Sequence, residues 1–286
     1  MRHRTSKFAE YETHWREWGE PGRPVAVLLH GYTQNGQAFQ ALARSLGANY
    51  HVVCPDALGR GYSSWIDRSA GSYSLSYIAE QMECLIEALG AEQVRWVGTS
   101  MGGIVGLLVA SGRLHDRITH LVLNDIGPAF PSSPTRVQET IAERRDNLEF
   151  TKFSEIEKFL RESYRENYSA QIDDEEWWHS FVDSVIHRDE KGAFRAHYDP
   201  QILMQFGDVL GEYDEWNAYC SLKCRVMVIR GMRSKVLPEE LYEEMRERRR
   251  PECTLAVPSA GHAPLLDTPK EIYEINRFFE LQADGN

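Results

Sequence analysis

The chain has 286 residues, 42% of them hydrophobic and 26% charged, a composition typical of a soluble globular protein with a sizeable core. Its formal net charge of −11 repels phosphate backbones, so we expect no nucleic acid partner. No segment reaches the roughly 18 apolar residues that a membrane span needs, and residues 1–10 lack the apolar core of a secretion signal. We therefore expect a cytoplasmic protein without a membrane partner.

Five cysteines at scattered positions predict reduced thiols rather than a disulfide framework. Cys220 and Cys224 are four residues apart, but no second cysteine or histidine pair lies at zinc-ligand spacing. We therefore predict buried structural thiols at both positions and no metal site. The sequence contains no nucleotide or flavin motif, and we expect no cofactor.

Short β-branched runs alternate with helical patterns along much of the chain, which indicates strands that feed crossover helices in a mainly parallel α/β sheet. The predicted strands are Val25–His30, His51–Cys54, Val94–Val97, Ile118–Leu123, Arg225–Ile229 and Cys253–Val257. The predicted helices are Gln37–Leu46, Leu75–Leu89, Ile104–Ala110, Glu239–Arg248 and Lys270–Glu280. Such a sheet places its functional loops at the carboxyl ends of the strands.

The alternation stops between about Phe130 and Leu222, where strands vanish and the composition becomes acidic, aromatic and helical. Helices are predicted at Ile156–Tyr164 and Glu175–Ile186, after a Pro-Ser-Ser-Pro linker at 131–134. We interpret residues 1–130 and 222–286 as the core and 131–221 as an inserted helical lid. Several lid aromatics either line an apolar acyl pocket or form the lid's own core, namely Trp177, Trp178, Phe181, Phe194 and Tyr198.

The motif Gly98-Thr-Ser-Met-Gly102 directly follows a predicted buried strand. A serine between a strand and a helix can simply be a helix N-cap. In this pattern, however, the glycines permit a sharp turn that leaves no room for Cβ atoms and lifts the Ser100 hydroxyl above the sheet edge. The backbone N–H of Met101 would then point at an oxyanion. The motif therefore favours Ser100 as a nucleophile.

Two further segments complete a resemblance to the α/β-hydrolase family over nearly the whole chain. His30-Gly-Tyr-Thr-Gln-Asn-Gly36 looks like the family's HG oxyanion loop, and Pro55-Asp-Ala-Leu-Gly-Arg-Gly-Tyr-Ser63 looks like its PDxxGxGxS turn. The resemblance implies an α/β-hydrolase fold in which the backbone N–H of Tyr32 is the second oxyanion donor. It also implies a structural role for Asp56, and we interpret His30 as a residue that braces its loop.

The general base in this family is a histidine near the carboxyl terminus. Pro258-Ser-Ala-Gly-His-Ala-Pro264 follows the last predicted strand, and its glycine and proline match the family's GH turn. An isolated loop histidine is usually only solvated, but this context points to His262 as the base. The other histidines occupy no such loop and nothing assigns chemistry to them, although His179, His187 and His197 could line the pocket from the lid.

The catalytic acid is where the sequence departs from the family. Relatives usually carry an aspartate after the glycine that ends the penultimate strand, but Gly231-Met-Arg-Ser-Lys-Val-Leu-Pro238 offers only Ser234 and Lys235 there. Asp125 ends the preceding strand, where some family members, including dehalogenases and cofactor-free ring-cleaving dioxygenases, keep their acid. The alternative is a turn carboxylate that bonds the backbone before Gly127. Lys235 could form an ion pair instead.

These residues predict a serine hydrolase in which Ser100 attacks a carbonyl, His262 transfers the proton and Asp125 orients His262. The expected substrate is a small or medium carboxylic ester or lactone. A vinylogous diketone cleaved at a carbon–carbon bond is an alternative, and ring-cleaving dioxygenase chemistry is a minor one. Epoxide hydrolases and haloalkane dehalogenases use an aspartate where Ser100 stands and are excluded. A ligand sensor with little or no turnover is a further alternative, which the missing acid in the Gly231 segment favours and the intact serine, histidine and oxyanion segments oppose.

Overall fold

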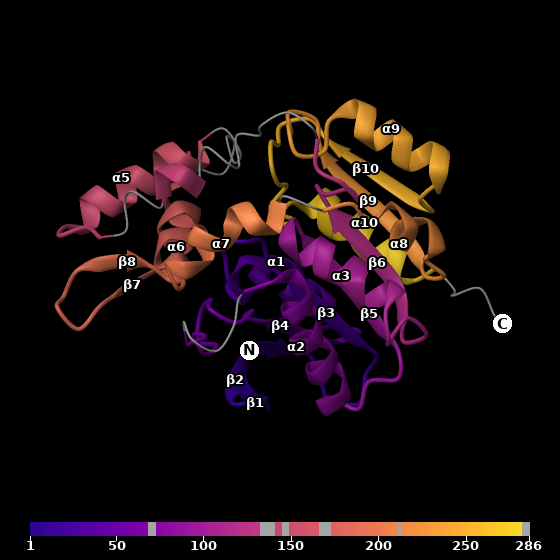
Figure 1. Ribbon diagram of the computed structural model, residues 1–286, viewed down its shortest axis with the longest axis horizontal. Helices are drawn as coiled ribbons and strands as arrows, with labels where there is room; N and C mark the ends of the chain where they lie inside the picture. Colours follow the sequence, from indigo (N-terminus) through magenta and orange to yellow (C-terminus); the bar gives the residue numbers. More distant parts are fainter. Residues whose placement is uncertain (68–72, 132–140, 145–148, 166–172, 211–212, 282–286) are drawn as a thin grey trace.

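The computed structural model describes residues 1–67, 73–131, 141–144, 149–165, 173–210 and 213–281, with only the backbone for residues 206–210. Its centre is an eight-stranded sheet in the order β1-β2-β4-β3-β5-β6-β9-β10 (Figure 1). The six strands from β4 to β10 in this order pair in parallel, whereas β2 pairs antiparallel with both β1 and β4. Their bounds are β3 Val25–Leu29, β4 His51–Pro55, β5 Val94–Thr99, β6 Ile118–Asn124, β9 Arg225–Gly231 and β10 Cys253–Val257. The predicted mainly parallel sheet is confirmed.

Helices cover both faces of this sheet because its strands are apolar on both sides. In β3, Val27 and Leu29 join one hydrophobic cluster while Ala26 and Leu28 join another, since successive side chains of a strand point to opposite faces. The first cluster also contains side chains of α2 (Leu75–Ala88), α3 (Met101–Ser111), α8 (Trp216–Ser221) and α9 (Glu239–Arg248). The second contains side chains of η1 (Gly36–Phe39), α1 (Gln40–Leu46) and α10 (Pro269–Phe279).

The structure adds an antiparallel hairpin at the edge of the sheet, β1 (Arg2–Phe8) and β2 (Tyr11–Trp18), which the hydrophobic pattern does not predict. Polar contacts hold it. The Glu17 carboxylate is buried, and it pairs with Arg2, Arg4 and His51 at 2.9–3.0 Å. Burial alone would raise the pKa of Glu17, but these partners outweigh it and bring the pKa to about 2. A strand that is held by ion pairs does not need alternating apolar residues, so the hydrophobic pattern of the sequence does not predict it.

Between β6 and β9 the chain leaves the sheet and forms an inserted segment, most of which projects to one side (Figure 1). Its elements are α5 Phe153–Tyr164, α6 Glu175–Val185, β7 Ile186–Arg188, β8 Phe194–Ala196, α7 Gln201–Leu210 and α8. The prediction that strands are absent here is wrong, because β7 and β8 form a short hairpin. These strands are three residues each, too short to show a period. Most of the predicted linker at 131–134 lies outside the described residues.

The aromatic residues of the inserted segment mostly form a small core of their own. Trp178, Phe181 and Phe194 are buried together with Ile156 and with side chains of both helices. Trp177 packs beside this cluster and stacks on Phe181 at 5.2 Å between ring centroids. Of the two interpretations that the sequence allows, the structure therefore favours the segment's own core for these rings. Tyr198 belongs to the main core of the sheet instead.

The inserted segment begins and ends at one place. Ala129 and Asp214 form an antiparallel bridge, and the Glu215 N–H donates to the Pro128 carbonyl at 2.7 Å. Tyr213 adds a hydrogen bond from its hydroxyl to the Gly127 carbonyl at 2.9 Å. The two chain segments that connect the insertion to the sheet are therefore fastened to each other.

All five cysteines are free, as predicted. Cys224 is buried, but Cys220 is exposed, so the prediction of two buried thiols is wrong for Cys220. The reason is helical geometry: Tyr219 turns its side chain into the core, and the next residue along a helix points about 100° away. Within the described ranges, no helix is both long and apolar enough to cross a bilayer.

Candidate active site

Ser100 lies at the turn between β5 and α3, half-buried, with φ of 51° and ψ of −115°. A Cβ atom on Gly98 would overlap the Gly102 carbonyl, and one on Gly102 would overlap the Leu29 carbonyl of β3. The expected absence of room for Cβ atoms is therefore confirmed. The Ser100 side chain makes no capping hydrogen bond to α3. Ser100 therefore occupies the N-cap position of α3 without capping the helix through its side chain, and the strained backbone instead presents the hydroxyl beyond the strand end.

Three side chains that lie far apart in the sequence form one chain of contacts at the carboxyl ends of the strands. His262 Nε2 lies 2.8 Å from Ser100 Oγ, and His262 Nδ1 lies 2.8 Å from Asp125 Oδ2. The Asp125 carboxylate is fully buried, whereas the His262 ring is 13% exposed. A carboxylate only accepts, so Nδ1–H donates to Asp125 and Nε2 is left to accept from Ser100. This is the protonation state that a general base requires.

Both carboxylate oxygens of Asp125 have a fixed partner. While Oδ2 faces His262, Oδ1 accepts the Gly231 N–H at 2.8 Å. The Asp125 backbone has φ of 58°, and its own N–H donates to the Ile229 carbonyl at 2.7 Å. The predicted alternative, a turn carboxylate bonded to the backbone before Gly127, does not describe these contacts. Gly231 ends β9, the strand after which most relatives carry their acid. Here this strand end supplies a backbone N–H donor to the Asp125 carboxylate instead.

The residues that replace the usual acid have a turn-forming role. Ser234 Oγ accepts the N–H groups of Val236 and Leu237 at 3.1 and 3.2 Å, which closes a turn. Lys235 points to solvent, and no ion pair of Lys235 is present among the described residues. Neither residue replaces the contact that Asp125 makes with His262.

Asn124 also positions the site, although the sequence analysis does not single it out. Its Nδ2 donates to Thr99 Oγ1 at 2.9 Å and to the Pro264 carbonyl at 2.8 Å. One buried amide thus ties the residue before Ser100 to the loop that carries His262. A polar residue directly before Asp125 at a buried strand end is the signal that could have identified it.

The residues expected to supply oxyanion donors lie on either side of Ser100. Met101 is the first residue of α3, and the N–H groups of a helix's first turn have no acceptor within the helix. Tyr32 is in the HG loop (His30–Gly36), which follows β3, the neighbour of β5 in the sheet. The Tyr32 hydroxyl donates to the Ile202 carbonyl of α7 at 2.5 Å. The inserted segment is therefore fastened to the HG loop.

His30 braces the HG loop, as interpreted from the sequence. Burial lowers the pKa of His30 to about 4, so the ring is neutral at neutral pH. Its Nε2 accepts the Ala57 N–H at 3.0 Å, which leaves Nδ1–H to donate to the Gly31 carbonyl at 2.7 Å. The ring joins the HG loop to the turn after β4.

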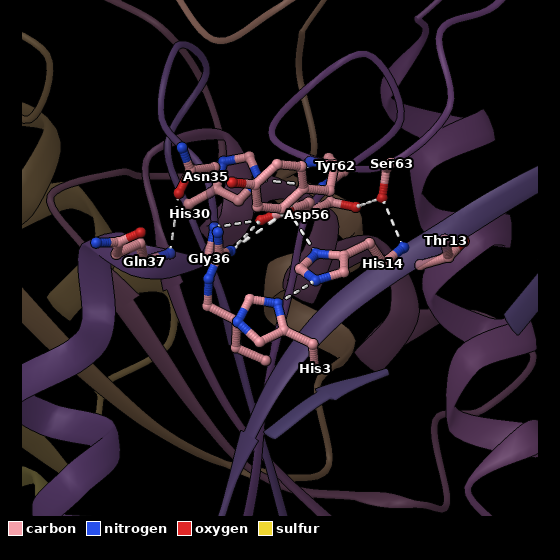
Figure 2. Close-up of polar contacts among 12 residues, drawn as sticks. His3, Thr13, His14, His30, Asn35, Gly36, Gln37, Asp56, Tyr62 and Ser63 are labelled. Carbon is pink, nitrogen blue, oxygen red and sulfur yellow. Dashed lines mark hydrogen bonds and ion pairs between the residues drawn. The ribbon is translucent and has the colours of Figure 1, made fainter. Parts of the chain in front are cut away.

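Asp56 is the second brace and has the predicted structural role (Figure 2). Its buried carboxylate accepts the Gly36 N–H at 2.7 Å, the Tyr62 N–H at 3.0 Å and His14 Nδ1–H at 2.8 Å. Arg16 Nη1 lies 3.1 Å away. Burial alone would raise the pKa of Asp56, but the hydrogen bond from His14 and the charge of Arg16 lower it to about 2. The carboxylate therefore holds both ends of the PDxxGxGxS turn.

Two cavities border the HG loop. One, of about 190 Å³, lies between η1 and α6 and is lined by Gln34, Arg44, Trp177 and Leu265, among others. Another lies beneath the inserted segment and is lined by Thr33, Arg144, Tyr164 and Tyr198, among others. Of the three histidines considered for a lid pocket, none lines either cavity, and His179 is exposed.

Comparison with known proteins agrees with the fold. A model of the Alpha/beta hydrolase family matches residues 26–275. The chain is 33% identical over 276 residues to the 3-hydroxybutyrate-oligomer hydrolase of Cupriavidus necator, which covers 93% of this chain and 92% of the relative. It is 25% identical over 261 residues to the pimeloyl-[acyl-carrier protein] methyl ester esterase of Aeromonas salmonicida, covering 90% and 95%.

A solved structure shares the whole architecture. An alpha/beta hydrolase from Novosphingobium aromaticivorans superposes with a TM-score of 0.83 at 27% identity, and the match covers 98% of each chain. The sheet order, the turn at Ser100 and these matches lead to one conclusion: the chain is an enzyme that belongs to the alpha/beta hydrolase family.

Proposed function

We propose that the chain is a serine hydrolase that cleaves a small or medium carboxylic ester through an acyl-enzyme. The observation that carries the proposal is the unbroken line of contacts from Ser100 Oγ through the His262 ring to Asp125, each 2.8 Å long. Nucleophile, base and orienting acid at hydrogen-bond distance are the arrangement that activates a serine hydroxyl.

In the first half of the reaction, Ser100 Oγ bonds to the ester carbonyl carbon while His262 Nε2 takes the hydroxyl proton. The carbonyl oxygen becomes an oxyanion, which the backbone N–H groups of Tyr32 and Met101 stabilise. Collapse of this intermediate breaks the ester C–O bond, and His262 returns its proton to the leaving alcohol. Asp125 stays ionised throughout and stabilises the imidazolium.

In the second half, water attacks the acyl group and His262 Nε2 takes a proton from that water. The resulting tetrahedral oxyanion uses the same two backbone donors. Its collapse releases a carboxylic acid, and the proton on His262 goes back to Ser100 Oγ. The enzyme returns to its starting state, so a single site supports many turnovers.

The natural substrate class that we propose is a short ester oligomer of a hydroxy acid. Support comes from the relative named 3-hydroxybutyrate-oligomer hydrolase, which matches nearly the whole of this chain. A second relative is named a methyl ester esterase, and it too acts on a carboxylic ester. We further propose that the inserted segment (131–221) acts as a lid over this substrate and that the enzyme works in the cytoplasm.

The test is steady-state hydrolysis of a short-chain aryl ester by the wild type and by Ser100→Ala, with Ser111→Ala as a control in the same helix. We expect sustained turnover that falls in Ser100→Ala by roughly a thousandfold or more and is unchanged in Ser111→Ala. An organophosphonate should add to the wild type at a single site, seen by mass spectrometry, and not to Ser100→Ala.

Other outcomes favour the alternatives. A wild type that releases no more than one equivalent of product would point to a ligand sensor. Cleavage of a vinylogous diketone without ester hydrolysis would point to a carbon–carbon hydrolase. Turnover that survives in Ser100→Ala would contradict the proposal. The sequence feature that favoured a sensor was the missing acid after Gly231, and Asp125 supplies a carboxylate at hydrogen-bond distance from His262.

A further inference from the structure

Arg60 contacts both residues that supply the oxyanion donors in the proposed mechanism, Tyr32 and Met101. It lies in the PDxxGxGxS turn, and its side chain is completely buried. Arg60 Nε donates to the Tyr32 carbonyl at 3.1 Å, and Nη2 lies 3.5 Å from Met101 Sδ. Nη1 donates to the Leu58 carbonyl at 2.8 Å, within the same turn. One planar guanidinium thus joins the HG loop to the start of α3.

Among the residues that the structure describes, no carboxylate oxygen lies at ion-pair distance from the Arg60 guanidinium, and the Asp56 carboxylate pairs with Arg16 and His14 instead. The charge of Asp199, in the inserted segment, acts on Arg60 from beyond ion-pair distance, and the Asp199 carboxylate accepts from the Tyr73 hydroxyl at 2.6 Å. The guanidinium instead lies 4.9 and 5.5 Å from the centroids of the Tyr32 and Tyr73 rings.

A buried charge that no carboxylate contacts is costly, so its retention calls for a compensating interaction. Burial lowers the pKa of Arg60, but a guanidinium starts so far above neutrality that it keeps its proton. The proposed reaction creates one negative charge close to Tyr32 and Met101, and that charge exists only in the tetrahedral state. In a site shielded from water, a fixed positive charge behind the two donors stabilises that state more than the neutral ester.

We propose that Arg60 is a positioning residue of the oxyanion hole, which fixes Tyr32 and Met101 and whose buried charge favours the tetrahedral oxyanion. The inference rests on the proposed serine mechanism and deepens it. It separates two roles of one guanidinium: a hydrogen-bonded brace, which a neutral donor can replace, and a charge, which only another cation can replace.

The experiment compares Arg60→Lys, which keeps the charge, with Arg60→Gln, which keeps a donor but loses the charge. The matched control is Arg95→Gln: Arg95 also donates to a backbone carbonyl and lies 5.0 Å from a tyrosine ring, but it is near the start of β5, at the opposite end of that strand from Ser100. For each variant, kcat and KM are measured with an aryl ester. Inhibition constants are measured for an alkylboronic acid, which binds serine as a tetrahedral anion, and for the matching neutral alcohol.

We expect Arg60→Gln to lower kcat by about ten- to a hundredfold with KM within about threefold of the wild type. Boronic acid affinity should fall by a similar factor while alcohol affinity changes little. Arg60→Lys should retain more of kcat and of boronic acid affinity than Arg60→Gln. Arg95→Gln should leave kcat, KM and the inhibition constants of the boronic acid and the alcohol unchanged.

The inference is overturned if Arg60→Gln equals or exceeds Arg60→Lys, or if the boronic acid and the alcohol lose affinity equally. Thermal melting shows which variants fold. Should Arg60→Gln not fold, Arg60→Lys decides, because the charge role requires its boronic acid affinity relative to the alcohol to stay within about threefold of the wild type. Failure of the serine mechanism itself looks different, since Ser100→Ala would then keep wild-type turnover.

Discussion

At the scale of single residues, the Asp125 carboxylate determines which nitrogen of His262 carries the proton. Its Oδ1 must accept the Gly231 N–H, so in Asp125→Asn the amide oxygen stays there and the NH₂ group turns toward His262 Nδ1. The imidazole would then keep its proton on Nε2 and lose the ability to accept from Ser100. We expect kcat to fall by roughly a thousandfold or more, measured with the same aryl ester.

A second substitution tests whether the acid has really moved from its usual strand end. Ser234→Ala removes the side chain of the turn where relatives carry their aspartate, and we expect kcat within about threefold of the wild type. Wild-type activity in Asp125→Asn, or a large loss in Ser234→Ala, would contradict the assignment of Asp125.

Which site residues the sequence can predict depends on whether a motif marks them. Ser100 and His262 stand in glycine-containing turns whose backbone demands are visible in the sequence. Asp125 follows from its place at a strand end once the Gly231 segment shows no acid. Asn124 belongs to no motif, and Arg60 stands at a position that the PDxxGxGxS motif leaves unspecified. The partners of both residues come from other parts of the chain and are brought near only by folding. The arginine between Gly59 and Gly61 gives no sign in the sequence that it is buried.

At the scale of secondary structure, α3 can approach β3 only because Gly102 has no side chain. A Cβ there would overlap the Leu29 carbonyl, which is part of the sheet and cannot move aside. We expect Gly102→Ala to lower the free energy of unfolding by on the order of 3 kcal/mol, measured by urea denaturation. Ser111→Ala, at the other end of α3, should change it by less than about 1 kcal/mol, and equal losses in the two variants would refute the argument.

The strands that the sequence predicts are those whose residues are mostly apolar. All six parallel strands lie within two residues of their predicted ends, and β3 and β4, which are buried at every residue, show why: burial on both faces favours nearly continuous apolar runs. The hairpin of β1 and β2 escapes prediction because Arg2, Arg4 and Glu17 hold it through ion pairs. The hydrophobic pattern of a sequence does not reveal such ion pairs.

At the scale of the whole molecule, buried histidines make the stability depend on pH. Burial lowers the pKa of His30, His120 and His197 to about 4, against an ordinary value of 6.5. Between these values the unfolded chain binds protons that the folded chain does not, so the free energy of unfolding falls as the pH falls from 6.5 to 4. A shift of that size corresponds to on the order of 3 kcal/mol for one histidine.

Urea denaturation measures this dependence when the free energy of unfolding is determined in steps of about one pH unit, from about pH 7.5 to about pH 4.5. We expect His120→Gln to flatten the slope of unfolding free energy against pH between pH 6.5 and 4. The reason is that His120, on β6, is buried against Phe278 of α10. His179→Gln should leave the slope as in the wild type, since that ring is exposed. A slope that His120→Gln does not change would contradict the argument.

The bridge between Ala129 and Asp214 bears on how this molecule can diversify. Because the two connecting segments meet there, the part of the insertion that has its own small core can change in length with little effect on the strands of the sheet. With the lid role that we propose, natural selection can then alter what the insertion presents to a substrate while Ser100, His262 and Asp125 keep their geometry. New specificities can therefore arise by exchange of one module, with the reaction chemistry inherited intact.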